Sequence, residues 1–338
     1  MKEKFVKYLK KTIFKNNLSI SSFILAKIQS FQYPKYLFRK EKIKINSTQK
    51  RITIIACSDE KPKQEQLKWG DYWVKYELAK EFKGLDYFVG DKNPNIIIHL
   101  LGTPIKLPKN TFNIAWIYSH PNWINPFMLR QYNKIFCLSS LFAEKIKKWG
   151  FDVELMIGAT NKTPIKNSNN IKYDITFVGN TRPIKGGRKI IHDLLPIPYN
   201  LKIWGKGWKE ILPEKYYGGE YINYLRLNDL YSSSLITLND HHQDMAEEGF
   251  VSVKIFDILA SGGFCLSDKN PGIEKIFGDA VPQYESPEHL KKLTDFYINN
   301  PEKRLELMER GKKIALSHTW NNRVKQFLNA TKKQNNTN

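Results

Sequence analysis

The sequence contains little cysteine: only Cys57, Cys137 and Cys265 occur in 338 residues. Each lies within an apolar run, and none has the CxxC or Cys/His spacing of a metal site. We expect all three to be small buried hydrophobic side chains, as in proteins of a reducing cytoplasm. The cysteine pattern therefore argues against a disulfide framework and against a zinc motif.

Long hydrophobic runs are also missing. No stretch of 18 or more apolar residues is present, so the sequence predicts no transmembrane helix. Residues 20–26 are apolar but contain two serines and end at Lys27, and no convincing small-residue cleavage site follows. We therefore predict no signal peptide and a cytoplasmic location.

Acidic residues are scarce relative to basic ones, with 33 Asp and Glu against 54 Lys and Arg, a net charge of +21. Residues 1–50 alone carry 13 basic and two acidic side chains, a net +11. So large an excess implies an anionic partner, such as a nucleotide phosphate, a membrane surface, a lipid-linked acceptor or a nucleic acid.

Residues 1–48 form a basic N-terminal extension. Phe5, Leu9 and Ile13 recur every four residues, and lysines occupy much of the remaining surface. Such a basic amphipathic helix is typical of a segment that binds an anionic membrane surface. A helix packed on the first domain, with its lysines in solvent, explains the pattern equally well. No nucleic-acid motif accompanies the charge, so we expect no nucleic-acid partner.

Strand-like and helix-like segments alternate along the rest of the chain. The first series has buried strands at 51–57, 95–101, 112–118, 135–138 and 153–156, with helices at 72–82 and 141–149. A polar stretch at 160–170 has the composition of a linker. The second series has strands at 174–179, 201–204, 234–238 and 264–266, with helices at 189–195, 253–260, 287–299, 301–317 and 319–330.

This alternation predicts two α/β domains with parallel sheets. We expect a first domain over residues 49–160 and a second over residues 171–318. Residues 319–338 would form a last helix and a polar tail. Ligands of open α/β sheets bind at the carboxyl ends of the strands, so we expect the ligand site between the two domains.

The stretch from 239 to 268 is central to the second domain. It contains a strand end, a glycine-containing loop, a helix, a glycine turn and a second strand. A loop between a parallel strand and a helix presents backbone N–H groups and the positive end of the helix dipole, where anions bind. Glu247, Glu248, Lys254 and Asp257 add polar groups. The alternative is that both glutamates merely favour the helix N-terminus and Asp257 lies on a solvated face.

Several short motifs occur in a fixed order: WGDY, WIYSHP, FVGNTR, WGKGW, LNDHHQDMAEEGFVSVKIFDILASGG and HTW. In this order the chain resembles bacterial glycosyltransferases of the GT-B fold, in the group 1 superfamily and its branch of spore-coat glycosyltransferase-like proteins. The resemblance spans residues 50–330. It implies two Rossmann-like domains facing a cleft, with a nucleotide-sugar donor bound mainly by the second domain. It further implies a last helix that crosses back to the first domain, and a reaction that usually proceeds with retention and without a metal or other cofactor.

The resemblance also assigns roles to acidic residues of the second domain. Asp257 would hold the ribose hydroxyls, since a carboxylate offers two acceptor oxygens to a diol. Glu248 would be the acid near the donor sugar, with Gly249, Phe250 and Ser252 beside the donor. Relatives have seven residues between the two acids, whereas eight lie between Glu248 and Asp257. Glu247 and Asp244 therefore remain alternatives to Glu248.

Basic residues would stabilise the departing diphosphate, on which charge develops during transfer. Arg182, Lys185 and Arg188 follow the strand at 174–179, Asn180 would orient their loop, and Lys254 would share their role.

The first domain contributes further candidates. His120 follows the strand at 112–118 and, by resemblance, lies near the donor sugar; a histidine that is hydrogen-bonded within a turn is the alternative. Gly70 and Asp71 would line the acceptor side or simply make a turn.

The sequence around His241 and His242 could suggest a metal site, because Asp240 and Asp244 are close in sequence. Their spacing does not match a helix-borne ligand set such as HExxH, so we predict no metal.

The expected function is transfer of a sugar from a nucleoside-diphosphate donor to a cell-envelope glycan or a lipid-linked acceptor. The protein would work in the cytoplasm, held at the inner face of the membrane by residues 1–48. A non-catalytic GT-B scaffold or surface-assembly protein, and a charge-driven protein that binds anionic surfaces or nucleic acid, remain alternatives. A dinucleotide dehydrogenase ranks last, because no GxGxxG follows an early strand.

Overall fold

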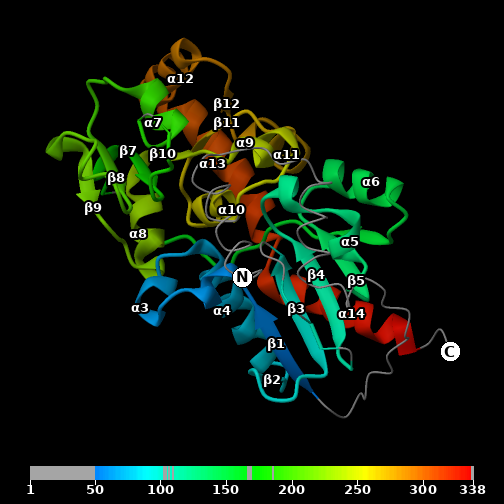
Figure 1. Cartoon of the computed structure of the whole chain (residues 1–338). Helices are drawn as coiled ribbons and strands as arrows, with labels where there is room; N and C mark the ends of the chain where they lie inside the picture. The colour runs from blue at the N-terminus through cyan, green and yellow to red at the C-terminus, as the bar shows by residue number, and fades with distance from the viewer. Residues whose placement is uncertain are drawn as a thin grey trace, which may run out of the picture. The chain divides into compact units, whose positions relative to one another are not determined.

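The computed structural model describes residues 50–101, 105, 107–108, 110–165, 170–184 and 186–335. The chain divides into two compact units (Figure 1). Unit 1 comprises Met1–Ile157 and Trp320–Asn338, and unit 2 comprises Gly158–Thr319. The predicted helix within residues 1–48 and the candidate Lys185 lie outside the described residues.

Unit 1 contains a six-stranded parallel sheet with the order β2-β1-β3-β4-β5-β6. Its strands are β1 (Arg51–Ile55), β2 (Phe88–Val89), β3 (Ile96–Leu101), β4 (Phe112–Ile117), β5 (Lys134–Cys137) and β6 (Val153–Leu155). Every residue of β3 and β4 is buried, as expected for central strands covered on both faces.

Helices connect these strands, and a last helix, α14, follows unit 2 in the sequence. They are α3 (Lys63–Gln66), α4 (Gly70–Lys83), α5 (Pro126–Leu129), α6 (Ser140–Lys148) and α14 (Trp320–Asn335), with 3₁₀ turns η2 (Cys57–Glu60) and η3 (Pro121–Trp123). Helix α6 begins where the sequence predicts, because the Ser139 hydroxyl accepts the N–H of Phe142.

Helix α14 packs in unit 1, although 162 residues of unit 2 separate it from the rest of that unit. Trp320 and Phe327 make edge-to-face contacts with Trp116 at 6.2 and 5.9 Å between ring centroids. Arg323 Nε donates to the carbonyl of Ile157 at 2.8 Å. The last helix therefore completes the core of the unit in which the strands of the first series lie.

Unit 2 contains a second six-stranded parallel sheet, with the order β12-β11-β10-β7-β8-β9. Its strands are β7 (Tyr173–Val178), β8 (Leu201–Trp204), β9 (Tyr217–Gly219), β10 (Ser234–Asn239), β11 (Cys265–Asp268) and β12 (Gln283–Tyr284). Phe177, Ile203, Ile236 and Leu266 anchor its buried core.

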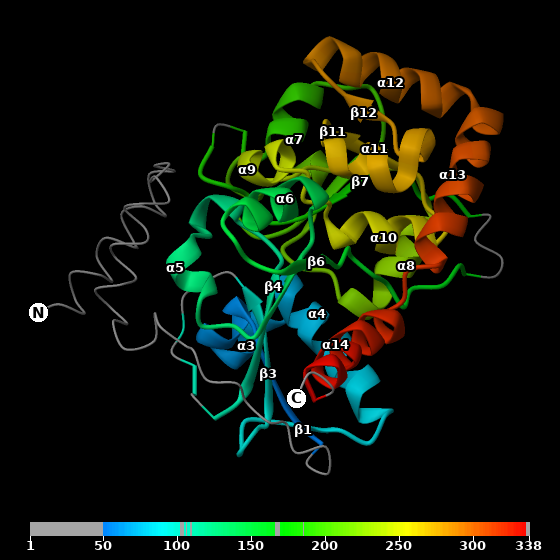
Figure 2. The same cartoon turned by 90° about the vertical axis from the view of Figure 1, so that its right-hand side faces the viewer.

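The helices of unit 2 are α7 (Lys189–Leu194), α8 (Leu227–Ser232), α9 (Gln243–Glu247), α10 (Val253–Ala260), α11 (Pro271–Phe277), α12 (Pro287–Asn299) and α13 (Pro301–Leu316). Three 3₁₀ turns accompany them, η4 (Glu214–Tyr216), η5 (Tyr224–Arg226) and η6 (Gly278–Ala280). Helices α12 and α13 run along one side of the unit, where α13 packs against α10 (Figure 2).

The stretch predicted to be a linker is only partly exposed. Thr160 and Lys162 are buried, and the Lys162 ammonium donates to the carbonyl of Tyr224 at 2.8 Å. The Thr160 N–H donates to the carbonyl of His318. The Thr160 and Lys162 side chains thus fill hydrogen-bonding positions inside unit 2, whereas Thr163 and Pro164 are exposed. Among the described residues, no helix is both long and apolar enough to span a membrane.

Candidate functional site

Unit 2 has one topological switch point, between its central strands β7 and β10. From β7 the chain proceeds to β8 and β9 on one side, and from β10 to β11 and β12 on the other. Loops leaving neighbouring strands in opposite directions open a crevice at the strand carboxyl ends, where α/β proteins bind ligands. The basic loop after β7 and the acidic segment after β10 meet at this point.

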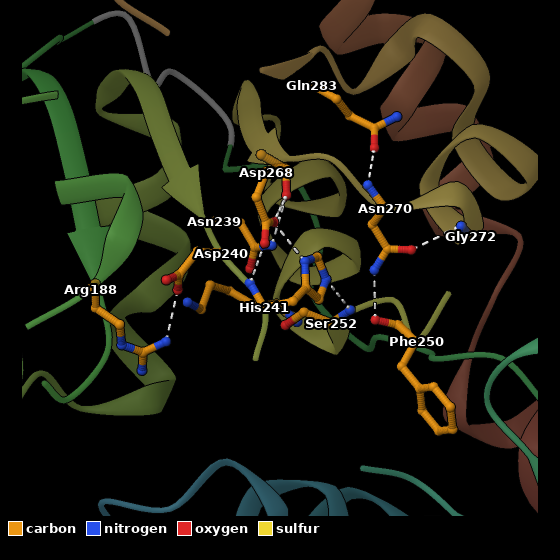
Figure 3. Close-up of polar contacts among 12 residues, drawn as sticks. Arg188, Asn239, Asp240, His241, Phe250, Ser252, Asp268, Asn270, Gly272 and Gln283 are labelled. Atoms are coloured by element: carbon orange, nitrogen blue, oxygen red, sulfur yellow. Dashed lines mark hydrogen bonds and ion pairs between the residues drawn. The ribbon is translucent and has the colours of Figure 1, made fainter. Parts of the chain in front are cut away.

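Asp240, directly after β10, contacts two arginines of the loop after β7. Its Oδ1 lies 2.7 Å from Arg188 Nη1 (Figure 3). Its Oδ2 lies 3.2 Å from Arg182 Nη1. The Asp240 side chain is 2% exposed, and those of the arginines are 14% and 13% exposed. Arg182 also donates to the carbonyl of His241, but its Nε is buried and has no hydrogen-bond partner within the described part of the chain.

Lys254, in the first turn of α10, adds a third cation. Its ammonium lies 4.9 Å from the centre of the Phe177 ring, over which the Arg188 guanidinium also lies at 5.5 Å. Burial, together with the neighbouring charge of Arg188, lowers the pKa of Lys254 to about 8. Burial and Arg188 likewise lower the pKa of Arg182 to about 10. The carboxylate of Asp240 contacts both arginines. An anionic ligand would stabilise the three positive charges further. We call Arg182, Arg188, Lys254 and Asp240 the cation cluster.

The loop that carries the arginines is fixed by the loop after β8. Asn180 Oδ1 accepts the N–H of Lys206 at 2.9 Å, and the indole N–H of Trp208 donates to the carbonyl of Gly179 at 2.6 Å. Gly207 has a positive φ of 87°, and a Cβ there would lie 2.2 Å from Thr181 Oγ1. The WGKGW turn thus needs its second glycine for this close approach.

His241 connects three segments around the cluster. Its backbone N–H donates to Asp268 Oδ2 at 2.8 Å, and its Nδ1 lies 2.7 Å from Asp268 Oδ1. The N–H of Ser252, the N-cap of α10, points at His241 Nε2 from 3.0 Å. Since an N–H donor faces Nε2, that nitrogen accepts, and the ring proton lies on Nδ1, from which it is donated to Asp268. This geometry ties the end of β10 to the end of β11 and to the N-terminus of α10 (Figure 3).

Asp268 remains an anion in this arrangement. Burial alone would raise its pKa, but the interaction with His241 and the hydrogen bonds from the His241 backbone and from Ser267 together lower the pKa of Asp268 below its ordinary value. It serves as the fixed acceptor that orients the imidazole.

Asn270, the N-cap of α11, fixes the loop before α10 from the other side. Its Oδ1 accepts the N–H of Gly272 at 2.8 Å, and its Nδ2 donates to the carbonyl of Phe250 at 2.9 Å. A Cβ on Gly272 would lie 2.3 Å from the carbonyl oxygen of Gly249. Glycine is therefore required where α11 meets this loop.

The backbone of the loop between α9 and α10 is less available than the sequence suggested. The N–H groups of Gly249 and Phe250 donate to carbonyls of α9, that of Ser252 donates to His241, and that of Lys254 donates to Ser252 Oγ. Four amides near the start of α10 thus already have acceptors. Side-chain cations, more than these amides, give the site its attraction for anions.

The acidic candidates Asp244, Glu247 and Glu248 lie on α9 or at its end. Glu247 is exposed and accepts a hydrogen bond from Gln243 on its own helix, and Glu248 is partly exposed at the end of α9. Asp244 lies in the first turn of α9, where its Oδ1 accepts the N–H of Met245. The negative charge of Asp244 raises the pKa of Arg182. Asp244 is therefore the one of these three acids that interacts electrostatically with Arg182 of the cation cluster.

Asp257 lies one turn beyond Lys254 on α10. It is 5% exposed, and its Oδ1 accepts the Thr160 hydroxyl at 2.6 Å. The carboxylate is therefore a buried partner of Thr160 rather than a group on a solvated face.

The candidates of unit 1 lie at the carboxyl ends of its strands. His120 follows β4 with a left-handed φ of 51°, and its Nδ1 lies 3.0 Å from Ser119 Oγ. Asp71 accepts the N–H of Ser58 at 2.8 Å; burial raises its pKa, although these backbone hydrogen bonds oppose the rise. A Cβ on Gly70 would meet open space, so no close contact requires glycine there.

The residues that sequence reasoning undervalued are Asp240, His241, Asp268 and Asn270. Their positions carried a signal, since Asp268 is the last residue of β11 and the other three lie within two residues of the end of β10 or β11. His241 and Asp240 had been weighed only as metal ligands. In the structure their side chains are hydrogen-bonded to Asp268 and the arginines, and no group of three His, Cys, Asp or Glu in the described residues is arranged to hold a metal.

Residues 182–329 match the family model described as "Glycosyl transferase-like". No curated protein matches the chain in sequence. Among solved structures, Anabaena Alr3699/HepE, a complex with UDP and glucose, aligns with a TM-score of 0.60 at 12% identity, over 84% of this chain and 99% of that one.

Two further structures share the fold. The T4 phage β-glucosyltransferase in complex with UDP-glucose aligns with a TM-score of 0.55 at 12% identity, over 84% of this chain and 99% of that one. An α-glucosyltransferase in complex with UDP and DNA containing an HMU base aligns with a TM-score of 0.58 at 10% identity, over 83% and 99%. These matches confirm the predicted GT-B fold and the predicted resemblance to glycosyltransferases of that fold. They do not specify a spore-coat branch.

Proposed function

We propose that the protein is a glycosyltransferase that takes a sugar from a nucleoside-diphosphate donor bound by unit 2. The observation that carries this proposal is the cation cluster at the switch point of unit 2. A diphosphate would place its oxygens against Arg182, Arg188 and Lys254, where charge-assisted hydrogen bonds are strong. The family match and the fold support a glycosyl donor over other diphosphates.

The chemistry of transfer explains why three cations are needed. As the bond between the anomeric carbon and the β-phosphate oxygen breaks, negative charge grows on the departing diphosphate. Fixed cations in a partly buried site stabilise that charge without reorganising. Because Asp240 holds both arginines in place before the donor arrives, the cluster is preorganised. No cofactor is part of this proposal.

The remaining assignments keep the roles that the resemblance implies. We propose that Asp257 holds the ribose, that Glu248 lies near the donor sugar together with Gly249 and Phe250, and that His120 approaches the sugar from the first domain. Retention is the proposed outcome; the fold occurs in both an α- and a β-glucosyltransferase, so the anomeric configuration of the product must be measured by NMR.

The proposed acceptor is a cell-envelope glycan or a lipid-linked sugar, reached from the cytoplasmic face of the membrane. The net charge of +21 and the basic extension support a location beside anionic lipid. Some structural neighbours act on DNA, so DNA containing an HMU base belongs in the acceptor panel.

The decisive experiment is a donor screen with the full chain. Thermal shift with UDP, GDP, CDP, ADP and TDP identifies the base, because a bound ligand stabilises the folded state by RT ln(1 + [L]/Kd). Hydrolysis and transfer are then followed with the matching nucleotide sugars. Stabilisation by one nucleotide that Arg188→Ala removes is the expected result. Binding without any hydrolysis or transfer would favour a non-catalytic scaffold, and no binding at all would refute a nucleotide donor.

A further inference from the structure

Helix α4 of unit 1 has two apolar faces. Val74, Leu78 and Phe82 are buried and form the inner face. A second set of side chains follows the helical spacing i, i+3, i+4 and i+7 and consists of Trp69, Tyr72, Trp73 and Tyr76. Packing against the sheet explains the first set but not the second. We call the second set, together with Leu67, the aromatic face.

The aromatic face is open to solvent. Trp69 is 39% exposed, Tyr76 43% and Leu67 39%. Trp73 contacts the rings of Tyr72 and Tyr76 edge to face, with centroids 5.2 and 5.5 Å apart. Its indole N–H donates to the carbonyl of Leu67 at 2.9 Å, which ties the rings to the preceding turn. A contiguous aromatic surface of this kind is a common feature of binding sites.

The face also lies where unit 1 is expected to bind a ligand. In the sheet of unit 1, β2 lies on one side of β1, and β3 to β6 follow on the other side. The switch point of this sheet therefore lies between β1 and β3. The segment that carries the aromatic face leaves the carboxyl end of β1 through η2. Asp71 holds that segment to η2 through the N–H of Ser58.

The net charge around the aromatic face indicates which class of ligand it can bind. Residues 57–77 contain five acidic and four basic side chains, a net charge of −1, within a chain of net charge +21. The ammonium of Lys75 pairs with Asp59 at 2.7 Å, and that of Lys61 lies over the Trp69 ring at 4.9 Å. Nucleic acid and anionic membranes are bound by surfaces with excess positive charge. A near-neutral aromatic surface is better matched to an uncharged ligand.

We propose that the aromatic face binds an uncharged oligosaccharide, whose sugar rings stack their C–H faces on Trp69 and Tyr76. Carboxylates and lysines around the rings supply acceptors and donors for sugar hydroxyls. The role of this glycan as acceptor rests on the proposed glycosyltransferase function. The binding itself does not, since it involves residues of unit 1 only.

The experiment measures glycan binding to the full chain by saturation-transfer NMR. The probes are neutral hexasaccharides of glucose, mannose, galactose and N-acetylglucosamine, each at about 5 mM, which detects millimolar affinity. At least one hexasaccharide should bind, and Trp69→Ala and Tyr76→Ala should each weaken it about tenfold. Trp69→Phe should keep most of the affinity, because the aromatic surface remains.

The matched control is Phe296→Ala, which removes a 46% exposed aromatic from unit 2 and should leave glycan binding unchanged. The proposal fails if no hexasaccharide binds, or if Trp69→Ala behaves like Phe296→Ala. It also fails if the aromatic face binds phosphatidylglycerol vesicles or single-stranded DNA in place of the sugars. Binding of the nucleotide identified in the thermal-shift screen is measured in the same samples. Intact nucleotide binding without glycan binding refutes only this proposal, and glycan binding without binding of any of the five nucleotides refutes only the proposed donor site.

Discussion

His241 Nδ1 donates to Asp268 across 2.7 Å, and this bond joins the ends of the neighbouring strands β10 and β11. The imidazole side chain is fully buried. The other ring nitrogen, Nε2, accepts a hydrogen bond from the N–H of Ser252. The backbone carbonyl of His241 accepts one from the Arg182 guanidinium. One residue therefore aligns the helix that carries Lys254 and the loop that carries the arginines.

Replacing His241 should weaken nucleotide binding without removing any group proposed to touch the donor. His241→Ala leaves the Ser252 N–H without its acceptor and removes the ring N–H that donates to Asp268, and each lost hydrogen bond costs about 1–3 kcal/mol in a buried setting. We expect a lower melting temperature and a nucleotide Kd raised about tenfold or more, measured by calorimetry.

Two conservative variants separate the bonds of His241. The amide of Asn can reproduce the donor to Asp268, and the longer Gln can reproduce the acceptor for Ser252. Each of His241→Asn and His241→Gln should therefore fall between wild type and His241→Ala. Nucleotide affinity equal to wild type in a stably folded His241→Ala would show that the ring does not position the site.

Arg188→Ala should reduce nucleotide affinity about 10- to 100-fold, because a hydrogen bond between charged groups contributes about 1.5–3 kcal/mol. The measurement is isothermal titration with the nucleotide identified in the thermal-shift screen. Arg310→Ala is the control, since Arg310 is 43% exposed and pairs with Asp279 on the surface of the same unit. Equal affinities of the two variants would contradict a diphosphate site at the cation cluster.

Nucleotide affinity should fall between pH 7 and pH 9. Lys254 has a pKa of about 8, so its ammonium is charged at pH 7 and largely neutral at pH 9. Arg182, with a pKa of about 10, keeps most of its charge over this range. The loss should approach tenfold per pH unit above pH 8 if the charged form alone binds. In Lys254→Arg the affinity should be retained and the pH dependence should flatten; an unchanged slope would exclude Lys254 as its source.

Unit 1 should lose stability in acid because of His99. This histidine is buried on β3 with its Nδ1 2.7 Å from the Tyr132 hydroxyl, and burial lowers its pKa to about 3. An unfolded histidine titrates near 6.5, so between pH 6.5 and 3 the unfolded state binds more protons. The free energy of unfolding should therefore fall with decreasing pH, by up to about 1.4 kcal/mol per unit. Urea unfolding of His99→Gln, which cannot titrate, should show a shallower acid dependence than wild type.

Two glycine-to-alanine substitutions should change the free energy of unfolding in different directions. Gly272→Ala places a Cβ 2.3 Å from the Gly249 carbonyl and should destabilise the protein by about 1–3 kcal/mol. Gly70→Ala, in the first turn of α4 with open space around it, should be neutral or stabilising by up to about 1 kcal/mol. Thermal unfolding of the pair provides the comparison, and a destabilised Gly70→Ala would indicate a contact at the start of α4 that the structure does not show.

The sequence predicted the long elements well because their patterns are strong. The predicted helices 253–260 and 287–299 match α10 and α12, and the strand 201–204 matches β8. Short edge strands were missed: β2 and β12 have two residues each, too few for a period to appear. Helices α9 and α11, of five and seven residues, were missed for the same reason.

The candidate site was predicted in part. Arg182, Arg188 and Lys254 converge because β7 and β10 are neighbours in the sheet, although β8 and β9 lie between them in the sequence. The roles of His241 and Asp268 depend on contacts across 27 positions of sequence, and no local pattern encodes them. Asn180 shows the same limit, since its partner Lys206 lies on another loop.

The position of helix α14 at the end of the sequence determines which unit can complete its fold first during synthesis. A ribosome makes residues 50–157 first, yet the core around Trp116 gains Trp320 and Phe327 only after all of unit 2 has emerged. Unit 2 is continuous in sequence and needs nothing that is made after it. During synthesis, unit 2 can therefore fold before unit 1 is complete, because the core around Trp116 lacks Trp320 and Phe327 until the last helix has been made.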